Sequence, residues 1–430
     1  MSTAKAAIDR TVDYITSKEA IAALGVKPET FYTYAGRGWI RRLPHPDGKH
    51  SLYSREDIER IRARSNARAG HAVAAAGAMH WGEPVIETSI TELTPAGPRY
   101  RGRLAVDLAG SGYSFESAAE LLWSGEWTGE ATTWPCSPLP FDPDQLVGEV
   151  DGFDPGSEIL EVLSMVTMRA CITARRERLT RPANSGLDNL DRARQIIKAY
   201  AGCIGYLSAE RRFVAGCTGA SVAAQIARIT DRLPAARTLD AINAALIISA
   251  DHELSASTFA ARLAASTGAD YFSCLGVALN SHAGGNIRGN CDDAEDMVLA
   301  CSDRTMFRDL IERLKQSARR IPGFNHPFYP KGDPRALYLL DIARALGARN
   351  GRVDLIFEFV EEAALRLRAY PSIALGLIAV CSAIGLPKRS AGLLWAIGWT
   401  AGWSAHIIEQ LRAGYMMRPR AKYVKRNTLS

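Results

Sequence analysis

The chain of 430 residues is longer than one ordinary domain, so we expect two or three folded units. Hydrophobic residues make up 47% of the chain and charged residues 23%, which is typical of a soluble globular protein with a large core. Its eight cysteines include no C-x-x-C pair, so neither a disulfide framework nor a metal site is indicated. We expect free thiols in a reducing cytoplasm.

Positive charge is concentrated in the N-terminal part of the chain. Residues 1–70 contain 13 Lys and Arg and 8 Asp and Glu, a net charge of +5, whereas the net charge of the whole chain is +6. A basic head on a near-neutral body indicates a polyanion-binding module, although short basic segments are also common without that role. The first residues lack the apolar stretch of a signal peptide, which is consistent with a cytoplasmic protein.

Two short helices are predicted at the start of the head. Ser17 is the expected N-cap of a helix that ends at Leu24, and Gly25 then makes a tight turn. Pro28 suits the first turn of a second helix that ends near Gly36.

A hairpin and a third helix are expected next. Residues 46–48 form the predicted turn, Ser51–Tyr53 the return strand, and Ser54 the cap of a helix over Arg55–Arg64. This order, over residues 1–66, resembles the winged helix-turn-helix domain of the MerR/excisionase type, most closely in GVKPETFYTYAGRGWIRRLP. In that family the second helix enters the major groove of DNA.

The resemblance implies two sets of DNA contacts. The residues expected in the groove are Lys27, Glu29, Thr30 and Tyr34, and those expected near phosphates are Arg41, Arg42 and Lys49. Domains of this kind also act as dimerisation or protein-docking modules, so the sequence leaves duplex DNA as one of several possible partners. Residues 67–80 are small and uncharged after Arg68 and are the predicted linker to the body.

The body is expected to be mostly helical, because apolar residues recur there at spacings of three and four. The clearest segments are Ser117–Trp123, Ser157–Arg176, Leu190–Leu207, Ala220–Arg232 and Asp240–Ser249. A short hairpin is expected near Glu83–Leu93, and no nucleotide-binding glycine motif is present. Two apolar runs, Ser372–Pro387 and Ala391–Ile408, are predicted as buried core helices, because polar residues, Gly and Pro interrupt them too often for a membrane span.

Three polar clusters carry the candidate chemistry, and each contains one histidine. They are ADHELSAST around His252, NSHAGGN around His282, and GFNHPFYPKGDPR around His326. Histidines in such clusters can serve as acids, bases or metal ligands, but a lone histidine is more often a satisfied polar group. Spacing alone leaves these alternatives open.

These clusters, with RYRG at 99–102, GWTAGWSAHIIEQ at 398–410 and RPRAKYV at 418–424, resemble the motifs of the citrate synthase family in their order along the chain. The resemblance implies an all-α fold with a large domain, residues 81–284 and 384–430, and a small domain, residues 285–383. The two domains of that family close over oxaloacetate and acetyl-CoA, and the family members are dimers. An acyl-CoA is therefore the expected substrate, with no further cofactor and no membrane partner.

The resemblance also implies roles for individual residues. His282 matches the histidine that stabilises the enolate of acetyl-CoA, and His326 matches the one that donates to the carbonyl of oxaloacetate. The oxaloacetate ligands correspond to His252 and Arg335, the arginine that reaches the neighbouring subunit corresponds to Arg418, and Lys331 and Gly332 lie where the family receives CoA.

Two positions depart from the family pattern. Ala374 stands where the family has its catalytic aspartate, and Trp399 stands where it has an arginine that holds a carboxylate of oxaloacetate. One of the acids that precede Tyr370 could replace the missing base, namely Asp354, Glu358, Glu361 or Glu362. Three interpretations stay open: an active condensing enzyme with an altered substrate, a silent ligand sensor or regulator, and the non-catalytic subunit of a heterodimer with a complete paralogue.

Overall fold

The computed structural model describes residues 14–36, 40–45, 50–55, 57–59, 86–135, 138–150, 159–180, 188–217, 219–230, 233–316, 321–347 and 350–419. The chain divides into two compact units. The N-terminal unit comprises Met1–Glu87 with Arg418–Ser430, and the body comprises Thr88–Met417. None of the helices in these described ranges is long and apolar enough to cross a membrane.

The first helix of the N-terminal unit, α1 (Ser17–Leu24), is capped by Thr16 and not by the predicted Ser17. The backbone N–H of Glu19 donates to Thr16 Oγ1 at 3.3 Å, and the backbone N–H of Thr16 donates to Glu19 Oε2 at 2.8 Å. This reciprocal capping box needs an acidic residue three positions after the cap, a spacing that Thr16 has and Ser17 lacks. The helix ends at Gly25, whose φ of 62° is accessible to glycine at little cost.

The rest of this unit contains the predicted second helix and hairpin, together with a first strand that was not predicted. Helix α2 spans Pro28–Gly36, and the strands β1 (Tyr14–Thr16), β2 (Arg42–Pro44) and β3 (Ser51–Ser54) form an antiparallel sheet in the order β1-β3-β2. Its small core consists of Ile15, Ala20, Phe31, Ile40, Tyr53 and Ile58. The predicted turn at 46–48, Lys49, the linker and the end of the third helix lie outside the described residues.

Arg41, for which a phosphate contact is predicted, also has a structural role in this unit. Its Nε lies 2.8 Å from Asp57 Oδ2 and its Nη2 lies 3.0 Å from Asp57 Oδ1. The carboxylate of Asp57 is buried, with 4% of its side chain exposed. Removing Arg41 would therefore leave a buried charge without this partner.

The body begins with a three-stranded sheet of β4 (Thr91–Thr94), β5 (Gly97–Tyr100) and β6 (Arg103–Leu104). The hairpin predicted near Glu83–Leu93 is therefore real but was placed too early in the chain. The turn falls between Thr94 and Gly97, whose φ of 117° suits glycine.

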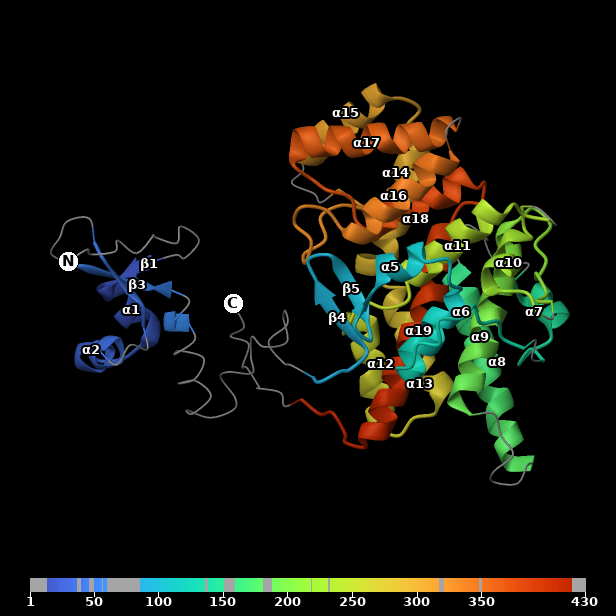
Figure 1. Ribbon diagram of the computed structural model, residues 1–430, viewed down its shortest axis with the longest axis horizontal. Helices are drawn as coiled ribbons and strands as arrows, with labels where there is room; N and C mark the ends of the chain where they lie inside the picture. The colour runs from blue at the N-terminus through green and yellow to red at the C-terminus, as the bar shows by residue number, and fades with distance from the viewer. Residues whose placement is uncertain are drawn as a thin grey trace, which may run out of the picture. The chain divides into compact units, whose positions relative to one another are not determined.

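Helices make up most of the body, as Figure 1 shows. They are α5 (Ala105–Gly110), α6 (Phe115–Ser124), α7 (Pro143–Val150), α8 (Ile159–Thr180), α9 (Asn189–Gly202), α10 (Val222–Ala227), α11 (Ala236–Ile248), α12 (Ala256–Ser266), α13 (Tyr271–His282), α14 (Asn290–Ala300), α15 (Arg304–Gln316), α16 (Pro334–Leu346), α17 (Gly351–Leu367), α18 (Ile373–Ala383) and α19 (Ser390–Ala413). Each of the predicted helical segments overlaps one of these helices. The predicted Leu190–Leu207 ends in a 3-10 turn, Cys203–Leu207, and the predicted Ala220–Arg232 shortens to α10.

The two apolar runs form the buried helices that the sequence predicted, α18 and α19. Helix α19 packs against α6, α9, α11, α12, α13 and α18 and is the central element of the body. It approaches the backbone of its neighbours closely at two glycines. A Cβ on Gly398 would lie 2.8 Å from Leu246 O, and a Cβ on Gly402 would lie 2.4 Å from Ala250 O. Small residues on α19 therefore bring the end of α11 directly against it.

Candidate functional site

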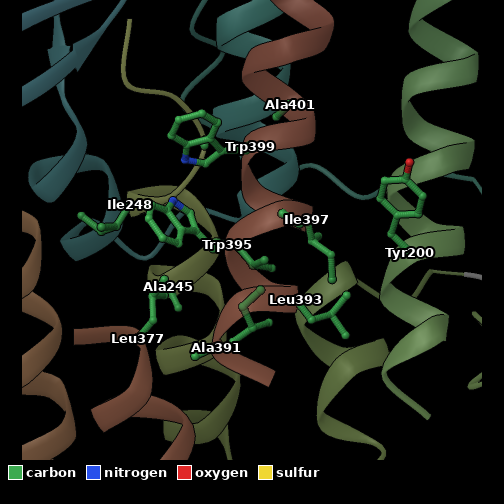
Figure 2. Packing of buried hydrophobic residues seen from close by; sticks show 14 of the residues in the cluster. Tyr200, Ala245, Ile248, Leu377, Ala391, Leu393, Trp395, Ile397, Trp399 and Ala401 are labelled. Atoms are coloured by element: carbon green, nitrogen blue, oxygen red, sulfur yellow. The ribbon is translucent and has the colours of Figure 1, made fainter. Parts of the chain in front are cut away.

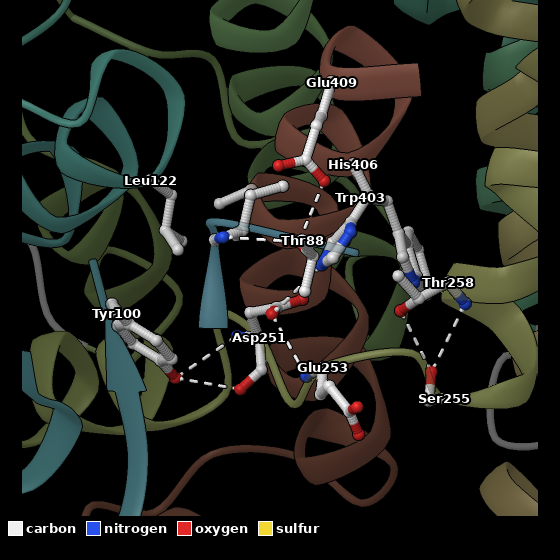
Figure 3. A network of polar contacts seen from close by, with 12 residues as sticks. Thr88, Tyr100, Leu122, Asp251, Glu253, Ser255, Thr258, Trp403, His406 and Glu409 are labelled. Atoms are coloured by element: carbon white, nitrogen blue, oxygen red, sulfur yellow. Dashed lines mark hydrogen bonds and ion pairs between the residues drawn. The ribbon is translucent and has the colours of Figure 1, made fainter. Parts of the chain in front are cut away.

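The segment that carries His252 connects α11 to α12 and is held on two sides. The Tyr100 hydroxyl of β5 lies 3.0 Å from Ile247 O. It also lies 3.2 Å from Asp251 O, as Figure 3 shows. From α19, the backbone N–H of Gly402 donates to Ala250 O at 2.9 Å. This anchoring fixes the backbone of the segment that carries His252.

The loop that carries His326 is held against the segment preceding α18. The backbone N–H of Asn325 donates to Tyr370 O at 2.8 Å, and that of Ser372 donates to Gly323 O at 2.9 Å. Gly323 has a φ of 79°, and a Cβ there would lie 2.9 Å from the Cβ of Ala294, so the tight passage needs glycine. The pairing brings this loop beside the beginning of α18.

The two anchored segments bring His252 and His326 together. Their ring centroids are 4.9 Å apart, and His252 Nε2 lies 3.3 Å from the Tyr329 hydroxyl. The Tyr329 ring lies 5.0 Å from that of His326, and the guanidinium carbon of Arg335 lies 5.9 Å from the Tyr329 centroid. We call His252, His326, Tyr329 and Arg335 the histidine cluster.

A backbone contact fixes the tautomer of His326. The N–H of Phe328 donates to His326 Nδ1 at 3.2 Å, so Nδ1 is the acceptor nitrogen of the neutral ring. The proton of a neutral His326 therefore sits on Nε2, which is available to donate to a ligand.

The charge of Arg335 is balanced inside the protein. Its Nε lies 3.0 Å from Asp333 Oδ1 and its Nη2 lies 2.8 Å from Asp333 Oδ2, with both side chains almost fully buried. Asp333 also caps α16, and its Oδ2 lies 3.3 Å from the backbone nitrogen of Ile373 in α18. The aspartate thus links the loop, α16 and the first turn of α18.

Burial and this arginine keep the two histidines neutral. Burial lowers the pKa of His326 to about 4, with a further contribution from the positive charge of Arg335. Burial, Arg335 and His326 hold the pKa of His252 well below its usual value. Burial also raises the pKa of Tyr329 to about 12. At neutral pH the histidine cluster therefore offers uncharged hydrogen-bonding groups around one internally paired guanidinium.

His282, at the end of α13, lies among tryptophans of α19. Its ring centroid is 5.3 Å from those of Trp395 and Trp399 and 5.5 Å from that of Trp403. Two residues after α13, the chain forms a π-helical turn, Gly285–Gly289, a feature that is frequent at functional sites. The structure therefore brings two of the predicted positions, His282 and Trp399, into contact with each other.

The remaining predicted positions are placed as follows. Ala374 is fully buried in the first turn of α18, and Lys331 is exposed on the loop before Gly332, whose φ is 116°. Arg418 belongs to the N-terminal unit and not to the body, which holds the histidine cluster.

Of the acids that could have replaced the missing base, one is paired with arginines and the other three line a different pocket. Glu362 is buried and accepts from Arg304, Arg308 and Arg366, which hold its pKa at about 2. The other three acids, Asp354, Glu358 and Glu361, line a separate pocket of about 400 Å³ together with Arg304, Arg344, Gly347, Val353 and Phe357. A carboxylate with such a low pKa is a poor base, so Glu362 does not compensate for Ala374.

Sequence reasoning did not single out Tyr100, Tyr329, Asp333 or Trp395. Two signals could have found some of them. Asp333 precedes Pro334, the pattern of a helix N-cap, and the tryptophans of α19 recur at intervals of four, which places them on one helix face. No signal in the sequence linked Tyr100 to the segment 247–251.

Residues 78–420 match the family model described as citrate synthase, C-terminal domain. The citrate synthase of Saccharolobus solfataricus is 33% identical over 202 residues, which cover 45% of this chain and 54% of that protein. The 2-methylcitrate synthase of Shewanella oneidensis is 29% identical over 196 residues, covering 45% and 52%. The chain thus spans about half the length of the curated relatives it matches.

Solved structures show the same fold. The citrate synthase of Thermoplasma acidophilum, in its ternary complex with carboxymethyl coenzyme A and oxaloacetate, aligns with a TM-score of 0.68 at 21% identity and covers 81% of this chain and 95% of that chain. The citrate synthase of Thermotoga maritima aligns with a TM-score of 0.66 at 20% identity, covering 82% and 97%.

Proposed function

Because the chain belongs to the citrate synthase family, we propose that it is an acyltransferase that condenses acetyl-CoA or another acyl-CoA with an oxo acid. The observation that carries the proposal is the histidine cluster, in which a neutral His326 holds its proton on Nε2 beside His252 and Arg335. A neutral imidazole donor in a largely buried site suits the protonation of a carbonyl oxygen that becomes negative as the new bond forms.

The proposed reaction assigns a task to each group. A base removes a methyl proton from the acyl-CoA, and His282 stabilises the enolate oxygen. The enolate carbon attacks the carbonyl carbon of the oxo acid, and His326 Nε2–H protonates the carbonyl oxygen. The proton that the base removed then returns to His326 through water, which restores the neutral imidazole. His252 and Arg335 hold a carboxylate of the oxo acid, and water then cleaves the thioester and releases CoA. The exposed Lys331 beside Gly332 suits the negative phosphates of CoA.

The proposal includes a slow first step. Ala374 offers no carboxylate, and a missing general base typically costs about 10²–10⁴ in rate. We therefore expect citrate formation from acetyl-CoA and oxaloacetate at least about 10²-fold slower than an ordinary turnover of ~1–10³ s⁻¹.

A steady-state assay of CoA release by the purified protein tests this function, with acetyl-CoA and propionyl-CoA each offered with oxaloacetate. Turnover in the ordinary range would show that another group supplies the base. Tight binding of both ligands without CoA release would instead favour a silent ligand-binding protein. CoA release that requires added paralogue would favour a heterodimer in which Arg418 completes the partner's site, whereas activity of the purified chain favours a homodimer.

The N-terminal unit favours a second function, binding of duplex DNA. This proposal is supported by the order β1, α1, turn, α2, β2 and β3, in which two helices joined by a turn precede a β-hairpin. Lys27 at the start of α2 and Arg42 in β2 are exposed, whereas Thr30 and Tyr34 are partly buried and Tyr34 packs against the small core. Lys27 and Arg42 are therefore the better candidates for contacts with phosphates, with Thr30 and Tyr34 contributing from the same helix.

A further inference from the structure

One face of α19 carries three tryptophans around His282. Trp395, Trp399 and Trp403 lie four residues apart, and neighbouring ring centroids in this series are 6.0 and 5.7 Å apart. Figure 2 shows the first two of these rings on the side of α19 near Ile248, at the end of α11. Trp399 occupies the position at which the family resemblance places an arginine.

The indole N–H groups of these tryptophans are not equivalent. Trp403 Nε1 donates to Ser257 Oγ at 3.3 Å, and Trp123 Nε1, in the same core, donates to Ala401 O at 2.9 Å. Trp395 Nε1 and Trp399 Nε1 are both buried and have no hydrogen-bond partner among the described residues, although the side chains are only 8% and 5% exposed. Buried indole N–H groups usually have an acceptor, so two orphan donors in contact call for an explanation.

The two donors face each other. Figure 2 shows the nitrogen of Trp399 on the edge turned toward Trp395 and the nitrogen of Trp395 on the edge turned toward Trp399. The rings are nearly perpendicular, at 88°. Two N–H groups cannot satisfy each other, but one oxygen atom has two lone pairs and can accept from both.

The charge of the surroundings limits which oxygen this is. Both indoles are uncharged, and the guanidinium of Arg335, which is proposed to hold the first carboxylate, also pairs with Asp333 and so cannot balance a second one. The histidines of the cluster are neutral at pH 7, since burial lowers both pKa values. A second carboxylate would therefore be desolvated without a cation to balance it, which is unfavourable. A neutral carbonyl oxygen has a much smaller desolvation cost.

We infer that the N–H groups of Trp395 and Trp399 form a binding subsite for one uncharged carbonyl oxygen of the acceptor substrate. The acceptor is then a 2-oxo acid with a single carboxylate and a neutral carbonyl group, such as an amide, at its other end. This inference rests on the proposed function and specifies its substrate class. In this subsite, neutral hydrogen bonds from the indole groups replace the pair of charges that the family resemblance implies at the position of Trp399.

Calorimetry on the full-length protein tests the inference with three probes: 2-oxosuccinamate (the 4-amide of oxaloacetate), oxaloacetate, and pyruvate, which lacks the distal oxygen. We expect 2-oxosuccinamate to bind about tenfold more tightly than either of the others, the size expected for one or two neutral hydrogen bonds. Trp399→Phe and Trp395→Phe should each lower that preference several-fold and leave the affinity for pyruvate nearly unchanged. Trp123→Phe, which removes a buried N–H that has a partner, should leave the preference intact.

A second measurement uses the wild-type protein and so does not depend on the folding of the variants. With ¹⁵N-labelled tryptophan, the indole N–H resonances of Trp395 and Trp399 should shift downfield when 2-oxosuccinamate binds. Those of Trp123 and of Trp134, whose Nε1 donates to Glu120 Oε1 at 2.8 Å, should not shift. Preferred binding of oxaloacetate, or unshifted resonances for both Trp395 and Trp399 at saturation, overturns the subsite. Binding with these shifts but without CoA release from any acyl-CoA keeps the subsite and overturns the proposed function instead.

Discussion

Ala374 sits where an added carboxylate would meet two opposing effects. As the second residue of α18 it lies at a helix N-terminus, where a negative charge is favoured by about 0.3–1 kcal/mol. It is also fully buried, and the Asp333 carboxylate accepts from the neighbouring Ile373 N–H. A carboxylate at 374 therefore experiences repulsion from Asp333 and a desolvation cost.

We predict that Ala374→Asp raises CoA release from acetyl-CoA at least about tenfold, a part of what a general base supplies. The gain requires that His282 and His326 support the enolate and the carbonyl as proposed. Ala379→Asp, at an equally buried position in the middle of the same helix, is the matched control and should lower stability without any gain in rate. Equal rates for the two variants, with melting temperatures measured alongside, would contradict the assignment of position 374.

The pKa of His326 makes stability depend on pH in a defined direction. A histidine whose pKa is lowered to about 4 in the folded state binds fewer protons there than in the unfolded state, where its pKa is about 6.5. The contribution of His326 to the free energy of unfolding is complete above pH 6.5 and is lost as the pH falls toward 4. A shift of this size corresponds to about 3 kcal/mol.

Denaturant unfolding at pH 7.5, 6, 5 and 4.5 measures this effect, with His326→Gln as the comparison. The free energy of unfolding of the wild type should fall more steeply between pH 6.5 and 4 than that of the variant. Subtracting the profile of the variant cancels the contributions of other titrating groups. One of them is Glu295, whose pKa is raised by burial, so that its contribution to stability increases as the pH falls. Parallel pH profiles would show that His326 is exposed or already charged in the folded protein.

At the scale of elements, the position of α19 depends on glycines. A Cβ at Gly402 would lie 2.3 Å from Asp251 Oδ1 and 2.4 Å from Ala250 O, in the segment that holds His252. A Cβ at Gly392 of the same helix would meet only Asp292 Oδ1, at 3.5 Å. The same substitution at these two positions therefore has opposite expected consequences.

Gly402→Ala should lower the free energy of unfolding by about 1–3 kcal/mol or more through overpacking. It should also weaken binding of the oxo acid, because the His252 segment must shift. Gly392→Ala should be neutral or stabilising, since alanine favours a helix by roughly 1 kcal/mol over glycine. Thermal melts and calorimetry on both variants measure the two effects, and a benign Gly402→Ala would mean that α19 and α11 pack less closely than described.

The elements were predictable where local rules decide them. Pro28 at the start of α2, Gly25 at the end of α1 and the apolar runs of α18 and α19 follow from backbone preference and hydrophobicity. The cap of α1 was misplaced by one residue, because two adjacent residues, Thr16 and Ser17, can both cap a helix and only the reciprocal bond with Glu19 distinguishes them.

The site was predictable only in part. Resemblance pointed to His252 and His326, which are far apart in the sequence and which the structure brings to 4.9 Å. It did not indicate that Tyr329 joins them or that Asp333 neutralises Arg335, since such contacts arise from tertiary packing. Likewise, spacing places Trp395 and Trp399 on one face of a helix, but only the atomic arrangement shows that their N–H groups face each other.

At the scale of the whole molecule, the basic N-terminal unit is joined to a body of near-neutral charge, and the proposal of DNA binding rests on this difference. Arg41 and Arg42 separate the structural and the binding contributions of this unit. Arg41 pairs with the buried Asp57, whereas Arg42 is exposed in β2. The two adjacent arginines therefore serve as controls for each other.

We predict that the full-length protein binds duplex DNA with an affinity that falls steeply as salt increases, because phosphate contacts release counterions. Fluorescence polarisation with labelled duplexes, from low to physiological ionic strength, gives the slope of log affinity against log salt. Arg42→Ala should weaken binding to all sequences alike and make the slope shallower by about 0.9, the value for one phosphate contact. Its melting temperature should stay unchanged.

Arg41→Ala should behave differently, because it leaves the Asp57 carboxylate buried without its guanidinium partner. We expect a loss of about 1–3 kcal/mol in the stability of the N-terminal unit, and weaker DNA binding only as a consequence of that unfolding. Lys388→Ala, at a half-exposed lysine of the body, removes the same charge from the other unit and should leave the salt slope unchanged. Salt-independent affinity, or equal slopes for wild type and Arg42→Ala, would contradict phosphate contacts by this unit. The unit would then be a protein-docking or dimerisation module.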